Sequence, residues 1–388
     1  MKVNKIAVLG VGTVGVVSLC HLIKYLPNCE LYSISDPNVK TLGIGESTNI
    51  QIPHDLFYGG KFNLLEQADK LDATVKYGVK YKNWRSEEFF SHIQPPNYGI
   101  HFNNFKLKDV VFKNVGDKIT EIKGSVNDIQ NNKNSVVVNV DDKLHHFDYL
   151  IDCRGYPTDY SDYDMVECLP LNHAIVHSIP KPGDWNYTYH LATKHGWTFG
   201  IPLKTRQGWG YLFNDNITSI EEAKSDLADN LNIKVDDLNL REFTFKPYKS
   251  KKFIDNRILR NGNRAAFFEP LEALSGAFYD RLNRGFYEHI CGLQSEDNLN
   301  KHLSFLSEQY INFICFIYSQ GSIYDTKFWK IAKEKTSNHL LNNTNWEATR
   351  EYIKKELYLK NDGLYRDKTY PFTSSIWKYF ADGFNYEF

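Results

Sequence analysis

The sequence predicts an α/β protein that combines a doubly wound parallel sheet, a β-meander crossover, and a mixed-sheet and helical module. Three observations lead to this prediction. Residues 5–36 alternate strand, glycine-rich turn, helix and strand. Short alternating segments separated by polar clusters fill residues 110–151. From Gly276 to the C-terminus, apolar residues recur at helical spacing.

Composition narrows the class of protein further. The 388 residues are enough for one large domain or two intergrown ones, and the net charge of -1 argues against a nucleic-acid partner. The six cysteines include no CxxC pair, no secretory leader opens the chain, and the longest apolar run, near residues 310–318, is too short for a bilayer. We therefore expect a cytoplasmic protein without membrane contact, either monomeric or a homo-oligomer.

The first βαβ unit carries a dinucleotide-binding pattern. A strand at Lys5–Leu9 leads into Gly10, Gly12 and Gly15, which form GxGxxG, and a helix at residues 16–26 follows. The glycines permit a tight turn, a close approach of phosphate to the backbone, and close helix–strand packing. Asp36 ends the second strand, where a carboxylate can accept a hydrogen bond from a ribose hydroxyl. The pattern predicts a Rossmann-like domain and does not separate NAD from FAD.

The remaining elements follow in order. We expect residues 55–90 to be helical or irregular, residues 110–151 to form the meander, and residues 149–152 to form a last parallel strand. Further predicted segments are meander strands at 110–112, 119–122, 135–140 and 147–151, and helices at 220–231, 278–293, 303–319 and 346–357. The predicted dinucleotide domain is residues 1–160 with 255–285, and the substrate module is residues 161–254 with 286–388.

Five later motifs indicate which dinucleotide is bound. In chain order they are GIGEST at residues 43–48, VKYKNW at 79–84, DCRG at 152–155, HGWTFGIPL at 195–203 and FFEPLE at 267–272. Together with the glycine turn, this series resembles the flavin-dependent halogenases, above all the tryptophan halogenase branch. DTKFW at residues 325–329 and Trp377 extend the resemblance towards the C-terminus.

The resemblance implies a cofactor, a reaction and a catalytic pair. The FAD-contacting residues would be the three glycines and the acid already named, with Gly43, Gly45, Glu46, Ser47 and Thr48. Reduced FAD and O2 would oxidise a halide ion to hypohalous acid, which must reach the substrate through a channel that excludes water. Lys80 would hold the acid by a hydrogen bond or as an N-halo amine, and Glu272 would stabilise the cationic ring. A separate NAD(P)H-dependent reductase would supply FADH2.

One motif of the resemblance is incomplete. Trp197 opens the counterpart of the family's WxWxIP box, but Phe199 replaces the second tryptophan, followed by Ile201 and Pro202. A large apolar ring is kept and the indole N–H is lost. The resemblance implies that these residues separate substrate from flavin, so that the enzyme halogenates and does not hydroxylate. The alternative interpretation is an ordinary buried aromatic pair.

The halide segment also departs from the family pattern. After Glu272 the chain reads Ala273, Leu274, Ser275 and Gly276, where the family typically has Ser, Thr and Gly. Either residues 274–275 or residues 275–276 supply the backbone N–H groups that bind halide. Alanine and leucine make this segment more apolar, which favours the weakly hydrated bromide and iodide over chloride.

The chain is shorter than tryptophan halogenases, and the shortfall is expected mainly between Lys80 and Asp152, including the helix after Phe102, and in the C-terminal part. A shortened chain predicts an open substrate site for small electron-rich aromatics such as indoles or phenols. The chain shows no HExxH motif and no Cys/His quartet, so no metal site is predicted. Two alternatives remain: a flavin monooxygenase that hydroxylates an aromatic ring, and a dinucleotide-binding protein without turnover.

Overall fold

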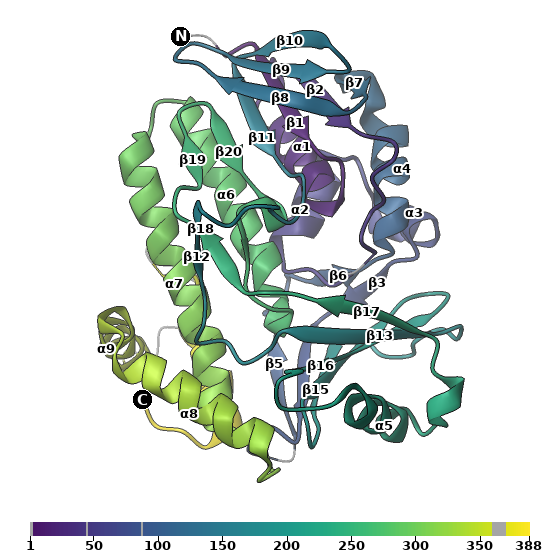
Figure 1. Cartoon of the computed structure of the whole chain (residues 1–388), viewed down its shortest axis with the longest axis vertical. Helices are drawn as coiled ribbons and strands as arrows, with labels where there is room; N and C mark the ends of the chain where they lie inside the picture. Colours follow the sequence, from purple (N-terminus) through teal and green to yellow (C-terminus); the bar gives the residue numbers. More distant parts are fainter. Residues whose placement is uncertain (1–2, 44–45, 87, 359–369) are drawn as a thin grey trace. The chain divides into compact units, whose positions relative to one another are not determined.

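The computed structural model describes residues 3–43, 46–86, 88–358 and 370–388. The chain divides into two compact units (Figure 1). The first unit comprises Met1–Ala73, Gly99–Asp164 and Tyr248–Ser304, and the second comprises Thr74–Tyr98, Met165–Pro247 and Phe305–Phe388. The predicted division differs from this one mainly at residues 74–98, which belong to the second unit and contribute two strands, β4 and β5, to its sheet.

A six-stranded sheet forms the centre of the first unit, in the order β19-β20-β11-β1-β2-β7. These strands are β1 (Lys5–Leu9), β2 (Glu30–Ser35), β7 (Ile119–Lys123), β11 (Tyr149–Asp152), β19 (Ile254–Asp255) and β20 (Ile258–Arg260). All neighbours are parallel except β19 and β20. The helix α1 (Thr13–Tyr25) connects β1 to β2. The predicted βαβ opening and the predicted parallel strand at residues 149–152 are therefore confirmed.

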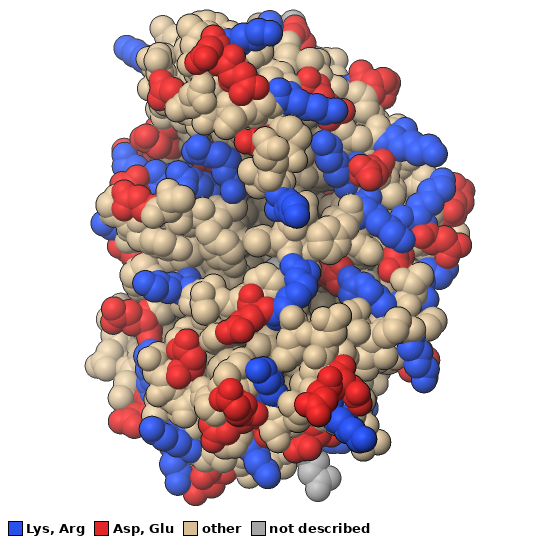
Figure 2. Space-filling view, turned by 45° about the vertical axis from the view of Figure 1, so that its right-hand side comes forward, with Lys and Arg blue, Asp and Glu red and all other residues tan. Residues whose placement is uncertain are grey.

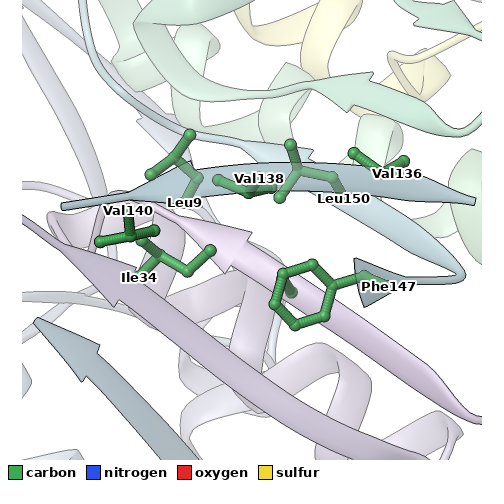
Figure 3. Packing of buried hydrophobic residues seen from close by; sticks show 8 residues of the cluster. Leu9, Ile34, Val136, Val138, Val140, Phe147 and Leu150 are labelled. Atoms are coloured by element: carbon green, nitrogen blue, oxygen red, sulfur yellow. The ribbon is translucent and has the colours of Figure 1, made fainter. Parts of the chain in front are cut away.

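The meander is smaller than the sequence predicts. It contains β8 (Val126–Asn131), β9 (Val136–Val140) and β10 (Lys143–Phe147), and its pairs are antiparallel. The segment at residues 119–122, predicted as part of it, instead forms β7 and pairs in parallel with β2. Figure 3 shows why the meander stays in place: Val136, Val138, Val140 and Phe147 pack against apolar side chains of the parallel sheet. Burial of these side chains is the main stabilising term.

Residues 104–115 form a helix that the sequence interpretation missed. Residues 110–112 were predicted as a strand and the helix after Phe102 as absent, and both predictions are wrong because α4 spans Asn104–Val115. The Asn103 side chain caps this helix by accepting from the Phe105 backbone N–H at 3.1 Å. The apolar side chains on its buried face recur at helical spacing and are Leu107, Val110, Val111 and Val115.

Short elements complete the first unit. They are α2 (Gln51–Tyr58), α3 (Leu64–Leu71), β6 (Gly99–His101), a small sheet of β12 (Tyr163–Met165), β18 (Tyr248–Ser250) and β21 (Ala266–Phe267), and α6 (Leu274–Ile290). Single 3-10 turns lie at Gly116–Lys118, Gly262–Arg264 and Leu271–Ala273. Leu271–Ala273 directly precedes α6, so it determines how the chain enters that helix.

A seven-stranded mixed sheet forms the centre of the second unit, in the order β17-β13-β16-β15-β14-β4-β5. The strands are β4 (Gly78–Lys82), β5 (Glu88–His92), β13 (His173–Ile179), β14 (Thr188–Ala192), β15 (Trp197–Pro202), β16 (Gln207–Phe213) and β17 (Leu240–Thr244), with β3 (Thr74–Lys76) nearby in the chain. Only β4 and β14 pair in parallel. The predicted helix at residues 220–231 is confirmed as α5 (Ile220–Leu231), which begins with a capping box of Ser219 and Glu222 and precedes a 3-10 turn at Val235–Asp237.

Helices dominate the C-terminal third, as predicted. They are α7 (Glu296–Gln320), α8 (Lys327–Leu341), α9 (Thr344–Tyr358) and α10 (Ser374–Phe384). Within the second unit, aromatic side chains of these helices pack on one face of the sheet, with Phe380 5.3 Å from Tyr81 and Trp329 5.0 Å from Trp84 between ring centroids. The surplus of aromatic residues in the sequence therefore forms part of the core of this unit.

Charged side chains of both signs are interspersed over the face of the molecule in Figure 2. The mixture agrees with the net charge of -1. Within the described part of the chain, no helix combines the length and the apolar character that crossing a bilayer requires.

Candidate active site

The glycine turn between β1 and α1 forms a cradle for a diphosphate. A Cβ on Gly15 would lie 1.9 Å from the Gly10 carbonyl oxygen, and a Cβ on Gly10 would lie 2.6 Å from that of Cys153, so both positions require glycine for packing. Gly12 is different, since nothing lies within 4 Å of its would-be Cβ. It is the N-cap of α1, which has neither a capping side chain nor an acidic residue in its first turn. The unhindered backbone and free N–H groups fit an anion such as a pyrophosphate.

The structure also positions the predicted ribose and flavin residues in the first unit. Asp36 directly follows β2, and its Oδ1 accepts from the Asn38 backbone N–H at 2.8 Å. Gly43 adopts φ +68°, and a side chain there would overlap the Phe105 ring. Gly45 lies outside the described residues. This arrangement fits a dinucleotide whose ribose reaches the end of β2.

Residues 46–48, which follow in the same segment, are held by pairing with residues 100–102 in and just after β6. The Thr48 N–H donates to the Ile100 carbonyl and the Phe102 N–H donates to the Glu46 carbonyl, both at 3.0 Å, and Ser47 forms a bridge with His101. Glu46 and Thr48 are buried. A buried polar segment held by backbone hydrogen bonds can present its backbone to a cofactor without rearrangement.

Glu272 has an unusual backbone conformation. Its φ is +58° and that of Ala273 is +55°, in the left-handed region that non-glycine residues seldom adopt. Each such residue costs about 1–3 kcal/mol and persists only where its surroundings hold it. Here the flanking side chains of Leu271 and Leu274 are buried and anchor the turn. The strained pair directs the chain into α6, so that Glu272 lies just before the helix N-terminus.

The three residues predicted to bind halide are the first three residues of α6: Leu274, Ser275 and Gly276. The first backbone N–H groups of a helix have no acceptor within it, and the helix dipole adds positive potential there. The N-cap, Ala273, offers no side-chain cap. Both alternatives, residues 274–275 and residues 275–276, therefore place suitable donors at this terminus.

Lys80 lies on β4 in the second unit beside a carboxylate that the sequence interpretation did not identify. Its Nζ is 2.8 Å from Glu88 Oε1, and its side chain is 23% exposed. The hydrogen bond to Glu88 raises the pKa of Lys80 above its ordinary value, against the opposing effect of burial. Lys80 is therefore an ammonium ion at neutral pH.

Aromatic side chains accompany Lys80 on the same face of the sheet. The strand registers pair Lys80 with Tyr189, Tyr189 with Gly200, and Gly200 with Trp209. Directly paired residues share a face, so these four residues form one row across the strands. The Lys80 Nζ is 5.6 Å from the Tyr187 ring centroid and 5.8 Å from that of Tyr189, which permits cation–π contacts.

Trp185 packs against two of these aromatic side chains, with its ring centroid 5.9 Å from that of Tyr189 and 5.8 Å from that of Trp209. Because Gly200 has no side chain, the Trp209 ring can lie over it. Trp185, Tyr187, Tyr189 and Trp209 are all half-buried, and we refer to these four residues as the aromatic group. The position of the aromatic group beside Lys80 depends on which strands pair, so the sequence motifs alone did not predict it.

The two rings of the incomplete WxWxIP box lie on the other face of the same sheet. His190 pairs in register with both Tyr81 and Phe199, which places Phe199 on the face opposite Lys80. Trp197 shares that face, is fully buried, and donates its indole N–H to the Tyr318 hydroxyl at 2.7 Å. The buried Ile201 lies on the same face as these two rings, whereas Pro202 lies on the Lys80 face. Their role as a barrier between substrate and flavin stays a prediction.

The predicted site residues thus fall into two groups. The first unit contains the glycine turn, Asp36 and the segment after it, Glu272 and the start of α6. The second unit contains Lys80 and the WxWxIP counterpart. The convergence of Lys80 and Glu272 stays a prediction. The parallel sheet and the open glycine at the N-terminus of α1 give the first unit the architecture of a Rossmann-type domain.

Comparison with known proteins identifies the family. The model of the tryptophan halogenase family matches residues 5–95 and 85–378, so the chain belongs to this family and is a flavin-dependent halogenase. It is 21% identical to tryptophan 7-halogenase RebH of Lentzea aerocolonigenes, over 86% of this chain and 79% of that protein. It is 22% identical to tryptophan 7-halogenase KtzQ of Kutzneria sp. (strain 744), with the same coverage of both chains.

Solved structures show the same fold. A tryptophan halogenase from Shewanella frigidimarina NCIMB 400 matches with a TM-score of 0.82 at 18% identity, covering 99% of this chain and 89% of that chain. Xcc4156, a flavin-dependent halogenase from Xanthomonas campestris, matches with a TM-score of 0.81 at 16% identity, covering 100% of this chain and 90% of that chain. The predicted fold class and the resemblance to flavin-dependent halogenases are therefore confirmed.

Gly12 and Gly15 should separate cofactor binding from folding. Gly12→Ala adds a methyl group in open space, at a φ that alanine accepts, so the protein should fold normally. The methyl group would keep a pyrophosphate from the backbone and weaken FAD binding on the order of 10-fold, about 1.4 kcal/mol. Gly15→Ala places a methyl group against the Gly10 carbonyl and should cost about 1–3 kcal/mol of stability. Flavin fluorescence titration and denaturant unfolding measure the two effects. An unchanged FAD affinity in Gly12→Ala would argue against this cradle.

Proposed function

We propose that this halogenase installs bromide or iodide on small electron-rich aromatic molecules, with Lys80 and Glu272 as its catalytic residues. The observation that carries the proposal is the family match over residues 5–378, which includes both residues within motifs that resemble those of the family. Bound FADH2 with O2 would supply the oxidation of halide to hypohalous acid. The residues that would hold FAD are those at the glycine turn, the end of β2 and the segment after it.

The surroundings of Lys80 support one of the two routes considered for it. An N-halo amine forms only on a neutral amine, whereas Glu88 stabilises the ammonium form of Lys80. We infer that Lys80 donates a hydrogen bond to the oxygen of hypohalous acid. The halogen then passes to the ring, the ring loses a proton, and the oxygen leaves as water. The proton that the ring loses ends in this water molecule, so Lys80 keeps its charge over a full turnover.

Glu272 and the start of α6 would act on the charged species. A carboxylate beside the ring stabilises the cation that forms when the halogen adds. The N-terminal N–H groups of α6 would hold the halide, as the free donors and the dipole favour an anion there. The strained backbone at Glu272 is consistent with this role, because such conformations cluster at functional sites.

The aromatic group supports the substrate class. Four half-buried rings beside Lys80 offer stacking and edge contacts to a flat molecule, and the Tyr187 hydroxyl donates to that of Tyr189 at 3.1 Å, which orients both. Indoles and phenols suit such a surface. A separate NAD(P)H-dependent flavin reductase would deliver FADH2, since no second dinucleotide motif is recognisable in the sequence.

Two alternatives make different products. A flavin monooxygenase would add oxygen to the ring and has no need for Lys80. A dinucleotide-binding protein without turnover would give no product, and the altered halide segment and Phe199 are the features that suggest it. Product mass separates all three.

Replacement of Lys80 should abolish halogenation and spare FAD binding. The protein is incubated with FAD, a flavin reductase, NADH, each halide, and a panel of indoles and phenols, and products are identified by mass. Lys80→Ala should lower halogenated product by about 100- to 10,000-fold, the range for loss of an acid–base group. Lys82→Ala is the matched control, because it is exposed, two residues along the same strand, and outside the proposed machinery.

The products of this screen discriminate between the three proposed functions. Near wild-type halogenation by Lys80→Ala would show that Lys80 is not the relay. A product heavier by one oxygen would favour the monooxygenase, and silence of the wild-type protein across the panel would favour a binding protein.

Halide competition should favour the larger anions. Alanine and leucine at positions 273 and 274 replace hydroxyl neighbours, so an entering halide finds few groups to replace its water. With equal concentrations of chloride, bromide and iodide, brominated and iodinated products should exceed the chlorinated product severalfold. Equal use of chloride would contradict this preference and leave the assignment of Lys80 untouched.

The charge of Lys80 can be tested through Glu88. Glu88→Gln removes the negative charge that stabilises the ammonium, so the pKa of Lys80 should fall towards its ordinary value. If the ammonium is the active form, activity lost at alkaline pH should be lost at lower pH in Glu88→Gln than in the wild-type protein. The measurement is the pH profile of kcat/KM with FADH2 in excess.

A gain of activity in Glu88→Gln at alkaline pH would have the contrary meaning. A neutral active form predicts that Glu88→Gln is faster than the wild-type protein just below the pKa of Lys80, because more amine is then unprotonated. That result would favour the N-halo amine.

A further inference from the structure

Three metal-ligating side chains that are far apart in the sequence meet in the second unit. Cys168 lies in the segment between β12 and β13, Cys315 lies on α7, and His339 lies on α8. Their ligand atoms all lie within 4.8 Å of one another. None of the three belongs to the proposed halogenation machinery, and the sequence interpretation predicted no metal site, because no short spacing connects them.

The distance between the sulfurs suits a shared metal ion. Cys168 Sγ and Cys315 Sγ are 3.7 Å apart. Two thiolates bound at about 2.3 Å to one tetrahedral Zn²⁺ lie roughly 3.8 Å apart, whereas the sulfurs of a disulfide are separated by only about 2.0 Å. The pair is therefore already close to the separation that a metal requires.

The imidazole of His339 is oriented as in metal sites. Its Nε2 lies 3.1 Å from Asn312 Oδ1, a shorter contact than the 3.4 Å to Asn343 Nδ2. Metal-bound histidines usually donate their second ring N–H to a carbonyl or carboxylate, which fixes the tautomer. A donation from Nε2 to Asn312 would present the lone pair of Nδ1 to the ion. Asn312 is itself buried, so the orientation is held from inside the unit.

The cluster is only partly enclosed. Cys315 is fully buried, while Cys168 and His339 are half-buried.

We propose that Cys168, Cys315 and His339 bind one Zn²⁺ ion, with water in the fourth position, and that this ion fastens the segment before β13 to α7 and α8. Two thiolates and one imidazole form a ligand set that selects Zn²⁺ over Mg²⁺ or Ca²⁺. The ligands come from three separate elements, so metal binding would add directly to folding stability.

The test measures Zn²⁺ binding to the full-length reduced protein in competition with a chromogenic chelator. The wild-type protein should bind one Zn²⁺ per chain and unfold at a higher temperature with the ion than without it. Cys168→Ser and His339→Ala should each lower the affinity on the order of 100-fold or more, and Asn312→Ala by about 10- to 100-fold. Cys291→Ser is the matched control, because Cys291 is exposed and lies outside the cluster. The Zn²⁺ affinity of this variant should equal that of the wild-type protein.

A second measurement does not depend on variants that could misfold. Co²⁺ replaces Zn²⁺ in tetrahedral sites, so the Co²⁺-loaded wild-type protein should show a thiolate-to-metal charge-transfer band. Equal Zn²⁺ affinity of wild-type and Cys168→Ser proteins, or a Co²⁺ spectrum without that band, would overturn the proposal. A Cys168–Cys315 disulfide in air, together with no Zn²⁺ uptake after reduction, would also overturn it.

Discussion

The parallel pairing of β4 with β14 is the interaction on which the candidate site depends. It joins β4 and β5, which follow the first part of the Rossmann-type unit in the chain, to the sheet of the second unit. Lys80 thereby becomes the neighbour of Tyr189, and the hairpin of β4 and β5 adds Glu88 on the same face. Parallel pairs require long crossovers, so this single register joins parts of the sequence that no local pattern connects. A slip of one residue would turn Lys80 to the opposite face, among buried aromatic rings.

The features that could be predicted from sequence have local causes. The strand, glycine turn and helix at the N-terminus follow from steric needs within the single segment of residues 5–25, and α5 begins at its capping box. The helix α4 was missed although Asn103 is a suitable cap, because its short apolar stretch was interpreted with a strand period. Glu88, the aromatic group and the Cys–Cys–His cluster depend on strand register and helix packing, which one sequence does not reveal. Lys80 and Glu272 were found only through family motifs.

The strained turn at Glu272 and Ala273 leads directly into the helix terminus that we propose as the halide site. Each left-handed residue opposes folding, and the burial of Leu271 and Leu274 offsets that cost. The turn ends where α6 begins, so its N-terminal N–H groups are not covered by an ordinary capping side chain. A serine or aspartate cap would stabilise α6 but would occupy the donors that we propose for the halide.

The second unit supports Lys80 from the opposite face of its sheet. Trp84, just after β4, packs against Trp197 and Tyr318, and Tyr318 lies one helical turn from Cys315 on α7. Close-packed side chains have low compressibility, so they transmit strain between the elements that carry them. An ion that fixes α7 would therefore stabilise the base of β4 without any contact with Lys80. This arrangement separates two requirements: the Lys80 ammonium group stays partly exposed on one face of the sheet, and the packing that positions β4 lies on the other face.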